Sequence, residues 1–320
     1  MQSTLSDLRR SLREACDAHG RLLYDEREAR AVADLVMAEV CGLSPADRIL
    51  HPDLPLPSDQ RQRVLHVARQ LAEGVPVQQA LGYAWFCGER FVVTPDVLVP
   101  RPETAELVQW VVSVATSFGS SEAPLRILDV GTGSGCIALS LARLIHHSDV
   151  FALDLSTAAL SVADQNAKQQ HISNVHFVHS DILRLSGEQQ STGLSTGCSP
   201  SSTIYPQASD VALPTFHVIV SNPPYVCQRE AVEMSSLVLD HEPSMALFVP
   251  DADPLLFYRA IARYALSHLV SGGYLFFEVN AAYGPDTCQL LEQLGFASVT
   301  LRQDVTGRDR MVSAQLLRSS

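Results

Sequence analysis

The chain has 320 residues, a formal net charge of −12, 46% hydrophobic residues and 18% charged residues. That length favours two domains with a sizeable core, the charge argues against a broad surface for duplex nucleic acid, and no apolar run is long enough to span a bilayer. The seven cysteines are scattered without a C-x-x-C pair, which supports neither a disulfide framework nor a zinc site. We therefore expect a cytoplasmic protein without a bound metal.

The first part of the chain, residues 1–84, has the pattern of a small helical domain. Apolar residues recur at helical spacing within Leu5–Leu12 and again within Ala31–Val40. The segment His51–Ser58 carries three prolines, which cannot continue a helix. Ser58 is expected to cap the helix that follows.

Residues 85–100 change to short extended runs. Glu89–Val93 and Val97–Val99 are rich in valine, and the turn-forming residues Thr94-Pro95-Asp96 separate them. This pattern predicts a β-hairpin that links the helical domain to the rest of the chain.

The remainder, residues 101–320, alternates strand-like apolar runs with helical stretches, which is typical of a doubly wound sheet. The expected strands are Leu125–Val130, Val150–Leu155, Val175–His179, Phe216–Ser221, Tyr274–Val279, Val299–Val305 and Met311–Leu317. A short turn joins the last two, so we expect them to form an antiparallel edge. The predicted fold class is therefore α/β, with a Rossmann-like, seven-stranded, mostly parallel sheet.

One segment interrupts this alternation. Residues 186–214 are rich in Ser, Thr, Gly, Gln and Pro, without periodicity, and the segment is longer than the usual loops of a compact domain. We interpret it as a disordered surface insertion, with a functional lid as the less favoured alternative.

The first expected strand of the sheet leads into Asp129–Gly135, in which three glycines precede a helix that begins near Cys136. Glycines let the backbone turn sharply and approach a ligand closely. The spacing G-x-G-x-G differs from the G-x-G-x-x-G of dinucleotide sites, and the carboxylate of Asp129 would repel a pyrophosphate. S-adenosylmethionine (SAM) carries an ammonium and a sulfonium, so its charge suits this loop.

Two further aspartates follow the next two strands. Asp154 lies about twenty residues after the glycine loop, where a carboxylate can accept hydrogen bonds from both ribose hydroxyls. Asp181 could accept a hydrogen bond from the adenine amino group, or only cap a helix. Because ligands of such sheets bind at the carboxyl ends of the strands, we expect these residues to converge with Asn222, which ends the fourth strand.

The four residues Asn222, Pro223, Pro224 and Tyr225 are interpreted as a clamp for a planar NH2 group. The Asn side chain offers an oxygen, two prolines stiffen the turn and expose a backbone carbonyl, and Tyr supplies an aromatic wall. Two fixed acceptors would hold a nitrogen lone pair in line with an electrophilic carbon. The alternative is a rigid surface turn.

Together these features resemble the class I SAM-dependent methyltransferases and, more narrowly, the HemK/PrmC family of release-factor glutamine methyltransferases. The resemblance rests on Asp129–Gly135, on Ser221–Tyr225 and on Val97–Thr104, whose V-L-V-P-R-P-E-T is similar to that family's V-L-I-P-R-P-E-T. Supporting strings are Asp240–Pro243 and Asp304–Arg310.

The resemblance implies transfer of a methyl group from SAM to the side-chain amide nitrogen (N5) of the glutamine in the Gly-Gly-Gln motif of peptide chain release factors, which act in translation termination. The residues expected to contact SAM are Asp129, Val130, Gly131, Thr132, Gly133, Asp154, Asp181, Ile182 and Asn222. The substrate glutamine would be held by Asn222, Pro223, Pro224 and Tyr225, with the first two catalytic. Arg101 and Glu103 would flank the substrate backbone, although Pro102-Glu103-Thr104 also suits a helix start.

The implied partner of the helical N-terminal domain is the release factor, and we expect a monomer that binds neither membranes nor duplex nucleic acid. Several positions depart from the family pattern. Ile182 stands where an aromatic residue often lies against adenine, Ala105 where a glutamate is common, and Tyr283 where a glutamine is usual. Gln79-Ala80 replaces an aromatic-aliphatic pair, and the insertion 186–214 is also unusual.

Other interpretations stay open from the sequence. An adenine or guanine amino methyltransferase acting on nucleic acid uses a similar clamp, although the net charge disfavours it. A SAM-binding protein without catalytic activity is a further alternative. His241 and Glu242 could act as a base, but we prefer a structural role because the nitrogen becomes very acidic once methylated.

Overall fold

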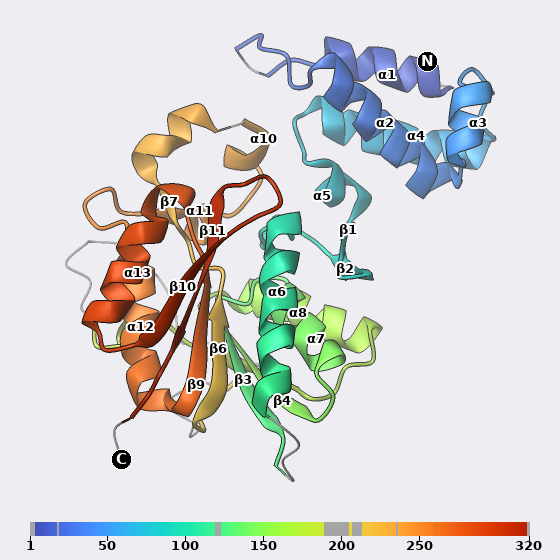
Figure 1. The fold of residues 1–320 in the computed structure, drawn as a ribbon. Helices are drawn as coiled ribbons and strands as arrows, with labels where there is room; N and C mark the ends of the chain where they lie inside the picture. The colour runs from blue at the N-terminus through green and yellow to red at the C-terminus, as the bar shows by residue number, and fades with distance from the viewer. Residues whose placement is uncertain are drawn as a thin grey trace. The chain divides into compact units, whose positions relative to one another are not determined.

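The computed structural model describes residues 4–17, 19–118, 123–188, 205–206, 213–234 and 236–318. The chain forms two compact units, whose elements are labelled in Figure 1. The helical unit comprises Met1–Ala84, Val93–Pro95 and Val232–Glu242, and the sheet unit comprises Trp85–Val92, Asp96–Ala231 and Pro243–Ser320. As proposed domains we retain 1–84, 85–100 and 101–320, with the addition that the segment 232–242 packs with the first.

The helical unit is built from short helices. They are α1 (Leu5–Glu14), α2 (Glu26–Cys41), α3 (Pro45–Leu50), α4 (Ser58–Ala72), α5 (Val77–Leu81) and α10 (Ser236–Leu239). Of these, α1, α2 and α3 have side-chain caps. Thr4 Oγ1 accepts a hydrogen bond from the Asp7 amide at 3.1 Å and so caps α1. Asp25 and Glu28 form a reciprocal capping box at α2, and this helix ends at Gly42 in the left-handed conformation.

The core of the helical unit takes residues from both predicted apolar runs, among them Leu8 and Val36, and further residues from α4. Leu8, Val36, Met37 and Leu71 are fully buried in it. The expectation for Ser58 is wrong, because Pro57 occupies the cap position and α4 begins at Ser58 itself, without a side-chain cap. Proline is tolerated at this position because the first N–H groups of a helix have no partner within the helix, so the N–H that proline lacks is not missed.

A β-hairpin follows, but with a turn other than the expected one. β1 (Tyr83–Phe86) pairs with β2 (Glu89–Val92), and Val97–Val99 is not a strand. Cys87 and Gly88 both have positive φ, 48° and 83°, which is the backbone that joins two twisted strands through two residues. Asn166 then ties β2 to the sheet unit: its side chain accepts from the Val92 amide at 2.7 Å and donates to the Val92 carbonyl at 3.1 Å.

The sheet unit contains the predicted seven-stranded sheet, in the order β10-β11-β9-β6-β3-β4-β5. Its strands are β3 (Leu125–Val130), β4 (Ser148–Asp154), β5 (Val175–His179), β6 (Phe216–Ser221), β9 (Leu269–Glu278), β10 (Ala297–Gln303) and β11 (Asp309–Gln315). Neighbouring strands from β9 to β5 are parallel, whereas β11 pairs antiparallel with β9 and β10. The α/β fold class with an antiparallel edge is thus confirmed.

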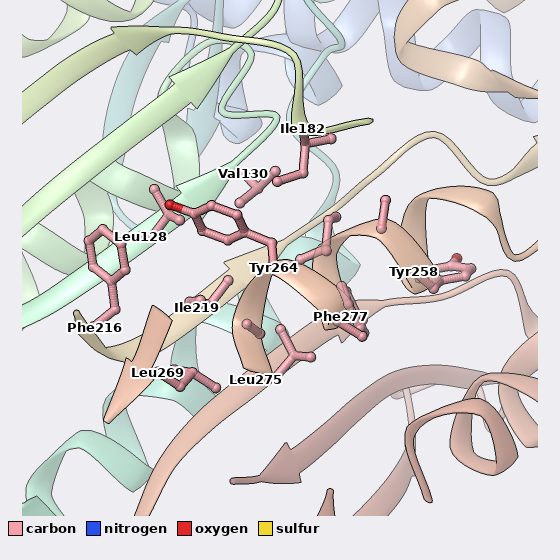
Figure 2. Packing of buried hydrophobic residues seen from close by; sticks show 14 of the residues in the cluster. Leu128, Val130, Ile182, Phe216, Ile219, Tyr258, Tyr264, Leu269, Leu275 and Phe277 are labelled. Carbon is pink, nitrogen blue, oxygen red and sulfur yellow. The ribbon is translucent and has the colours of Figure 1, made fainter. Parts of the chain in front are cut away.

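Alternate residues of the buried strands face two separate cores. On β4, Val150 belongs to the core shared with α6 (Pro102–Ala115), α7 (Cys136–Leu144) and α8 (Thr157–Gln169), and Phe151 to the core on the other face. That second core receives α9 (Ile182–Leu185), α12 (Leu256–His268) and α13 (Gly284–Gln293). Figure 2 shows its packing, in which Tyr258 and Tyr264 of α12 lie among strand residues such as Leu128, Ile219 and Phe277.

Short elements complete the sheet unit and its connections. They are η1 (Thr116–Phe118), β7 (Val226–Cys227), η2 (Gln228–Glu233), α11 (Ser244–Leu247), β8 (Phe248–Val249) and η3 (Ala281–Tyr283). Most of the expected insertion 186–214 lies outside the described residues.

Candidate active site

The site is placed where three parallel strands end at the same edge of the sheet. In the register of the sheet, Val130 at the end of β3 pairs with Leu153 of β4 and with Ser221 of β6. The glycine loop, Asp154 and Asn222 therefore follow neighbouring strands at one level. This is the edge at which doubly wound sheets bind their ligands.

The loop after β3 has the backbone that its glycines predict. Gly131, Gly133 and Gly135 have φ of 73°, 56° and 81°, all in the left-handed region. A Cβ on Gly135 would lie 3.1 Å from Cβ of Ala163, so this glycine lets α7 approach α8 closely. Gly131 and Gly133 have no atom within 4 Å of such a Cβ, which leaves their backbone accessible to a ligand.

Asp129 is the fully buried acidic residue at the end of β3. One carboxylate oxygen, Oδ2, accepts from Thr132 Oγ1 at 2.7 Å and from the Ala138 amide at 3.1 Å. The other, Oδ1, is buried without a hydrogen-bond partner among the described residues. Burial raises the pKa of Asp129 to about 7, against the lowering effect of these two donors.

An orphaned buried acceptor of this kind costs about 1–3 kcal/mol. A cationic ligand beside Oδ1 would recover that cost and favour the ionised carboxylate. The residues present therefore fit the ammonium or sulfonium of SAM, and they do not fit a pyrophosphate.

Asp154 ends β4 and reaches the same loop. Its Oδ2 accepts from the Gly133 amide and its Oδ1 from the Ser156 amide, both at 2.8 Å. Each oxygen retains a further lone pair. The carboxylate can thus hold the glycine loop and still accept two hydroxyl groups, as a ribose would require.

Asp181 and Ile182 follow β5 and have evident structural roles. Asp181 caps α9 by accepting from the Leu183 amide at 2.9 Å, and Ile182 is 7% exposed within the core that Figure 2 shows. The Ser180 amide donates to the Asp154 carbonyl at 3.0 Å, which connects this turn to the end of β4. A contact of Asp181 or Ile182 with adenine stays a prediction.

Asn222 directly follows β6 and is held by a side chain from α6. Its Nδ2 donates to Thr104 Oγ1 at 3.2 Å, and Thr104 in turn donates to Glu278 Oε2 at 2.6 Å. The Tyr225 hydroxyl donates to the second oxygen, Glu278 Oε1, at 3.2 Å. The two ends of the predicted clamp are thus connected to one buried carboxyl group, that of Glu278: Tyr225 directly and Asn222 through Thr104.

Thr104 and Glu278 are absent from the residues that the sequence predicts for the site. Thr104 is 2% exposed and Glu278 is 1% exposed, at the start of α6 and at the end of β9. The available signal was the position of Thr104 inside the R-P-E-T string, but nothing in the sequence pairs it with a residue 174 positions away.

Arg101 and Glu103 lie at the start of α6, where the sequence places a helix N-terminus. Arg101 has the extended backbone of an N-cap and Glu103 is the acidic residue of the first turn. Burial raises the pKa of Glu278, and the charge of Glu103 adds to that effect. Burial also raises the pKa of Tyr225, while the charge of Arg101 opposes it. The charge of Glu103 therefore influences Glu278, and the charge of Arg101 influences Tyr225 of the clamp.

Two further candidates, the proposed bases, are in the helical unit. His241 and Glu242 belong to the helical unit, where the Gln79 amide donates to the His241 carbonyl at 2.9 Å. Within the described residues, no group of three or more His, Cys, Asp and Glu side chains could hold a metal ion. A membrane-spanning helix is likewise absent from that part of the chain.

Comparisons with known proteins find similar sequences over most of the chain. Residues 11–82 match the family model described as PrmC N-terminal domain, and residues 121–195 match the model described as Methyltransferase domain. A release factor glutamine methyltransferase of Flavobacterium psychrophilum is 38% identical over 91% of this chain and 93% of its own length. One of Bacteroides thetaiotaomicron is 36% identical over 91% and 94%.

Among solved structures, the catalytic domain of hMettl16 superposes with a TM-score of 0.53. It is 15% identical, and the match covers 88% of this chain and 93% of that one. At this identity the likeness concerns the fold alone, and it supports a methyltransferase fold for the sheet unit.

Proposed function

The chain belongs to the release factor glutamine methyltransferase family, and on that premise we propose that it transfers a methyl group from SAM to N5 of the glutamine in the Gly-Gly-Gln motif of peptide chain release factors. The observation that carries this proposal is the fixed amide of Asn222, one strand away from a glycine loop beside the buried carboxylate of Asp129, one oxygen of which has no hydrogen-bond partner among the described residues. A clamp for an NH2 group thus lies beside a site for a cation.

SAM, when bound, supplies a methyl group on a positively charged sulfur. We assign its binding to the glycine loop and the strand ends: Asp129, Val130, Gly131, Thr132, Gly133, Asp154, Asp181, Ile182 and Asn222. Asp129 provides negative charge, Asp154 provides acceptors for the ribose, and the backbone of Gly131 and Gly133 permits close approach.

The acceptor is a primary amide, whose nitrogen is a poor nucleophile because its lone pair is delocalised into the carbonyl. Asn222 Oδ1 and the Pro223 carbonyl would each accept a hydrogen bond from one of its two N–H groups. The lone pair of the nitrogen would then point toward the methyl group. The new N–C bond forms as the C–S bond breaks, and the electron pair of that bond stays on sulfur. The nitrogen then loses a proton to water, so a strong base is not required.

The residues around the clamp shape the substrate site. Pro224 and Tyr225 form its wall, and Tyr225 is fixed by its hydrogen bond to Glu278. We assign Arg101 and Glu103, at the start of α6, to flank the substrate backbone. The opposite charges of these two residues suit the carbonyl and amide groups of an extended peptide.

The release factor is the proposed partner of the helical unit, whose residues 11–82 match the PrmC N-terminal domain. A monomer in the cytoplasm suits a substrate that is itself a translation factor. With a net charge of −12, the chain is not expected to bind duplex nucleic acid directly.

Incubation with labelled SAM tests the proposal, with a release factor in one reaction and single-stranded or duplex nucleic acid in the others. We expect label on the release factor alone. Label on nucleic acid alone would identify an adenine or guanine amino methyltransferase instead. SAM binding without transfer to any acceptor would point to a binding protein.

A further inference from the structure

Four side chains, two of them in the clamp, form a set of hydrogen bonds that converges on the carboxyl group of Glu278. Asn222 Nδ2 donates to Thr104 Oγ1 at 3.2 Å, Thr104 donates to Glu278 Oε2 at 2.6 Å, and Tyr225 donates to Glu278 Oε1 at 3.2 Å. Thr104 and Glu278 are buried. The direction of these hydrogen bonds determines whether Asn222 presents its side-chain oxygen or its NH2 group to the substrate.

The hydroxyl of Thr104 is the decisive link because it has a single hydrogen. That hydrogen is used in the short bond to Glu278, so Thr104 can only accept from Asn222. The neighbouring amide must therefore present Nδ2 to Thr104. Oδ1, at the other end of the planar amide, is turned away from Thr104.

Glu278 has the surroundings of an acceptor at both oxygens. Each oxygen receives a hydroxyl hydrogen, one from Thr104 and one from Tyr225. Burial raises the pKa of Glu278, while the two hydroxyl donors and the positive charge of Arg310 oppose that rise by favouring the carboxylate. Arg310 in turn donates from Nε to Asp304 Oδ2 at 3.2 Å. A carboxylate here pulls the Thr104 hydrogen inward.

Building on the proposed function, we propose that Glu278, through Thr104, is a positioning residue that sets the polarity of the Asn222 amide, so that its oxygen rather than its NH2 group meets the substrate. With the opposite polarity, Nδ2 would face the NH2 group of the substrate glutamine, and two donors would oppose each other. Neither Glu278 nor Thr104 needs to touch the substrate for this effect.

The substitution Glu278→Gln tests the polarity because it reverses the direction of the hydrogen bonds from Glu278 to Asn222 while each of these bonds can still form. The Gln oxygen can still accept from Tyr225, while its NH2 group donates to Thr104. Thr104 then donates to Asn222 Oδ1 and turns Nδ2 toward the substrate. We expect turnover to fall about 100-fold, comparable to the loss of one preorganised hydrogen-bonding group, with an unchanged SAM dissociation constant.

A second substitution should restore a hydrogen-bond acceptor for the NH2 group of the substrate. In Glu278→Gln combined with Asn222→Asp, the new carboxylate accepts from Thr104 with one oxygen and presents the other to the substrate. We expect this double variant to be about tenfold more active than either single variant. Asn222→Asp alone should be poor, since its oxygen would face a Thr104 oxygen whose hydrogen is committed to Glu278.

Matched variants of Thr104 separate positioning from packing. Thr104→Ser keeps the hydroxyl and should keep turnover within about threefold, whereas the isosteric Thr104→Val removes it and should lose about 100-fold. Normal SAM binding in each variant shows that the sheet unit is folded. Wild-type turnover by Glu278→Gln, or a double variant no better than both single variants, would overturn the inference.

A substrate-free measurement keeps this inference distinct from the proposed function. The side-chain 15N–1H signals of Asn222, assigned by their loss in Asn222→Asp, report the bond from Nδ2 to Thr104. We expect them to shift in Thr104→Val and in Glu278→Gln but not in Thr104→Ser. Unshifted signals would contradict the polarity model, even if the wild-type enzyme proved to methylate something other than a release factor.

Discussion

The Ser221 hydroxyl donates a hydrogen bond of 2.6 Å to the carbonyl oxygen of Val130. Both residues are buried, and each is the last residue of its strand. The next residues are Asn222 of the clamp and Gly131 of the glycine loop. This hydrogen bond therefore connects the residue just before the clamp, which would hold the methyl acceptor, to the residue just before Gly131 of the loop that would hold the methyl donor. Such a connection suits a reaction that depends on the alignment of the two substrates.

Removal of the clamp amide should separate chemistry from donor binding. We expect Asn222→Ala to reduce methyl transfer by about 100-fold or more, because the substrate nitrogen loses a fixed acceptor. The SAM dissociation constant, measured by calorimetry, should rise far less than turnover falls, because Asn222 is only one of several residues assigned to SAM. Full activity in this variant would exclude the clamp model.

Asp154 should govern affinity for the donor rather than the chemistry. Loss of its carboxylate removes two acceptors for the ribose and releases the Gly133 amide. We expect Asp154→Ala to raise the SAM dissociation constant at least about tenfold, because each hydrogen bond to a charged group contributes about 1.5–3 kcal/mol. An unchanged constant would rule out the ribose role.

Asp129 should make SAM binding dependent on pH. Its pKa of about 7 means that the carboxyl group is mostly neutral below that value and ionised above it. Because a cation prefers the ionised form, the SAM dissociation constant should fall about tenfold for each pH unit up to about pH 7, and then level off. The isosteric Asp129→Asn should bind weakly with a flat profile, and a flat wild-type profile would contradict the assignment.

Gly135 should be needed for stability as well as for conformation. In Gly135→Ala a left-handed φ is combined with a Cβ 3.1 Å from Cβ of Ala163, whereas Gly295, with φ of 90°, has nothing within 4 Å. Left-handed strain costs about 1–2 kcal/mol at either position, and crowding should add about 1–3 kcal/mol at Gly135. Urea unfolding of both variants measures the difference, and equal losses would show that α7 shifts to accommodate the methyl group.

The strand ends were predictable because local pattern determines them. A buried apolar run followed by Asp or Asn marks β3, β4 and β6, and parallel strands bring these residues to one edge whatever their separation in sequence. The expected hairpin turn at Thr94-Pro95-Asp96 was wrong for a local reason as well. Cys87 adopts a positive φ, which is unusual for a residue other than Gly, and only the pairing of β1 with β2 reveals it.

The hydrogen-bonded support of the clamp was not predictable from the sequence. Thr104 and Glu278 meet only because α6 packs near β9 and β6, and neither residue type signals a partner so distant in the sequence. Glu278 also reads as an ordinary strand end. Its importance follows from its burial and from the two hydroxyl groups that donate to it.

The most direct test of the proposed activity is mass spectrometry of a release factor after incubation with the enzyme and SAM. We expect one added methyl group on the glutamine of the Gly-Gly-Gln motif with the wild-type enzyme and, over the same incubation time, about 100-fold less of that product with Asn222→Ala. An unmodified release factor, together with a methylated amino group on nucleic acid in a parallel reaction, would contradict the proposal.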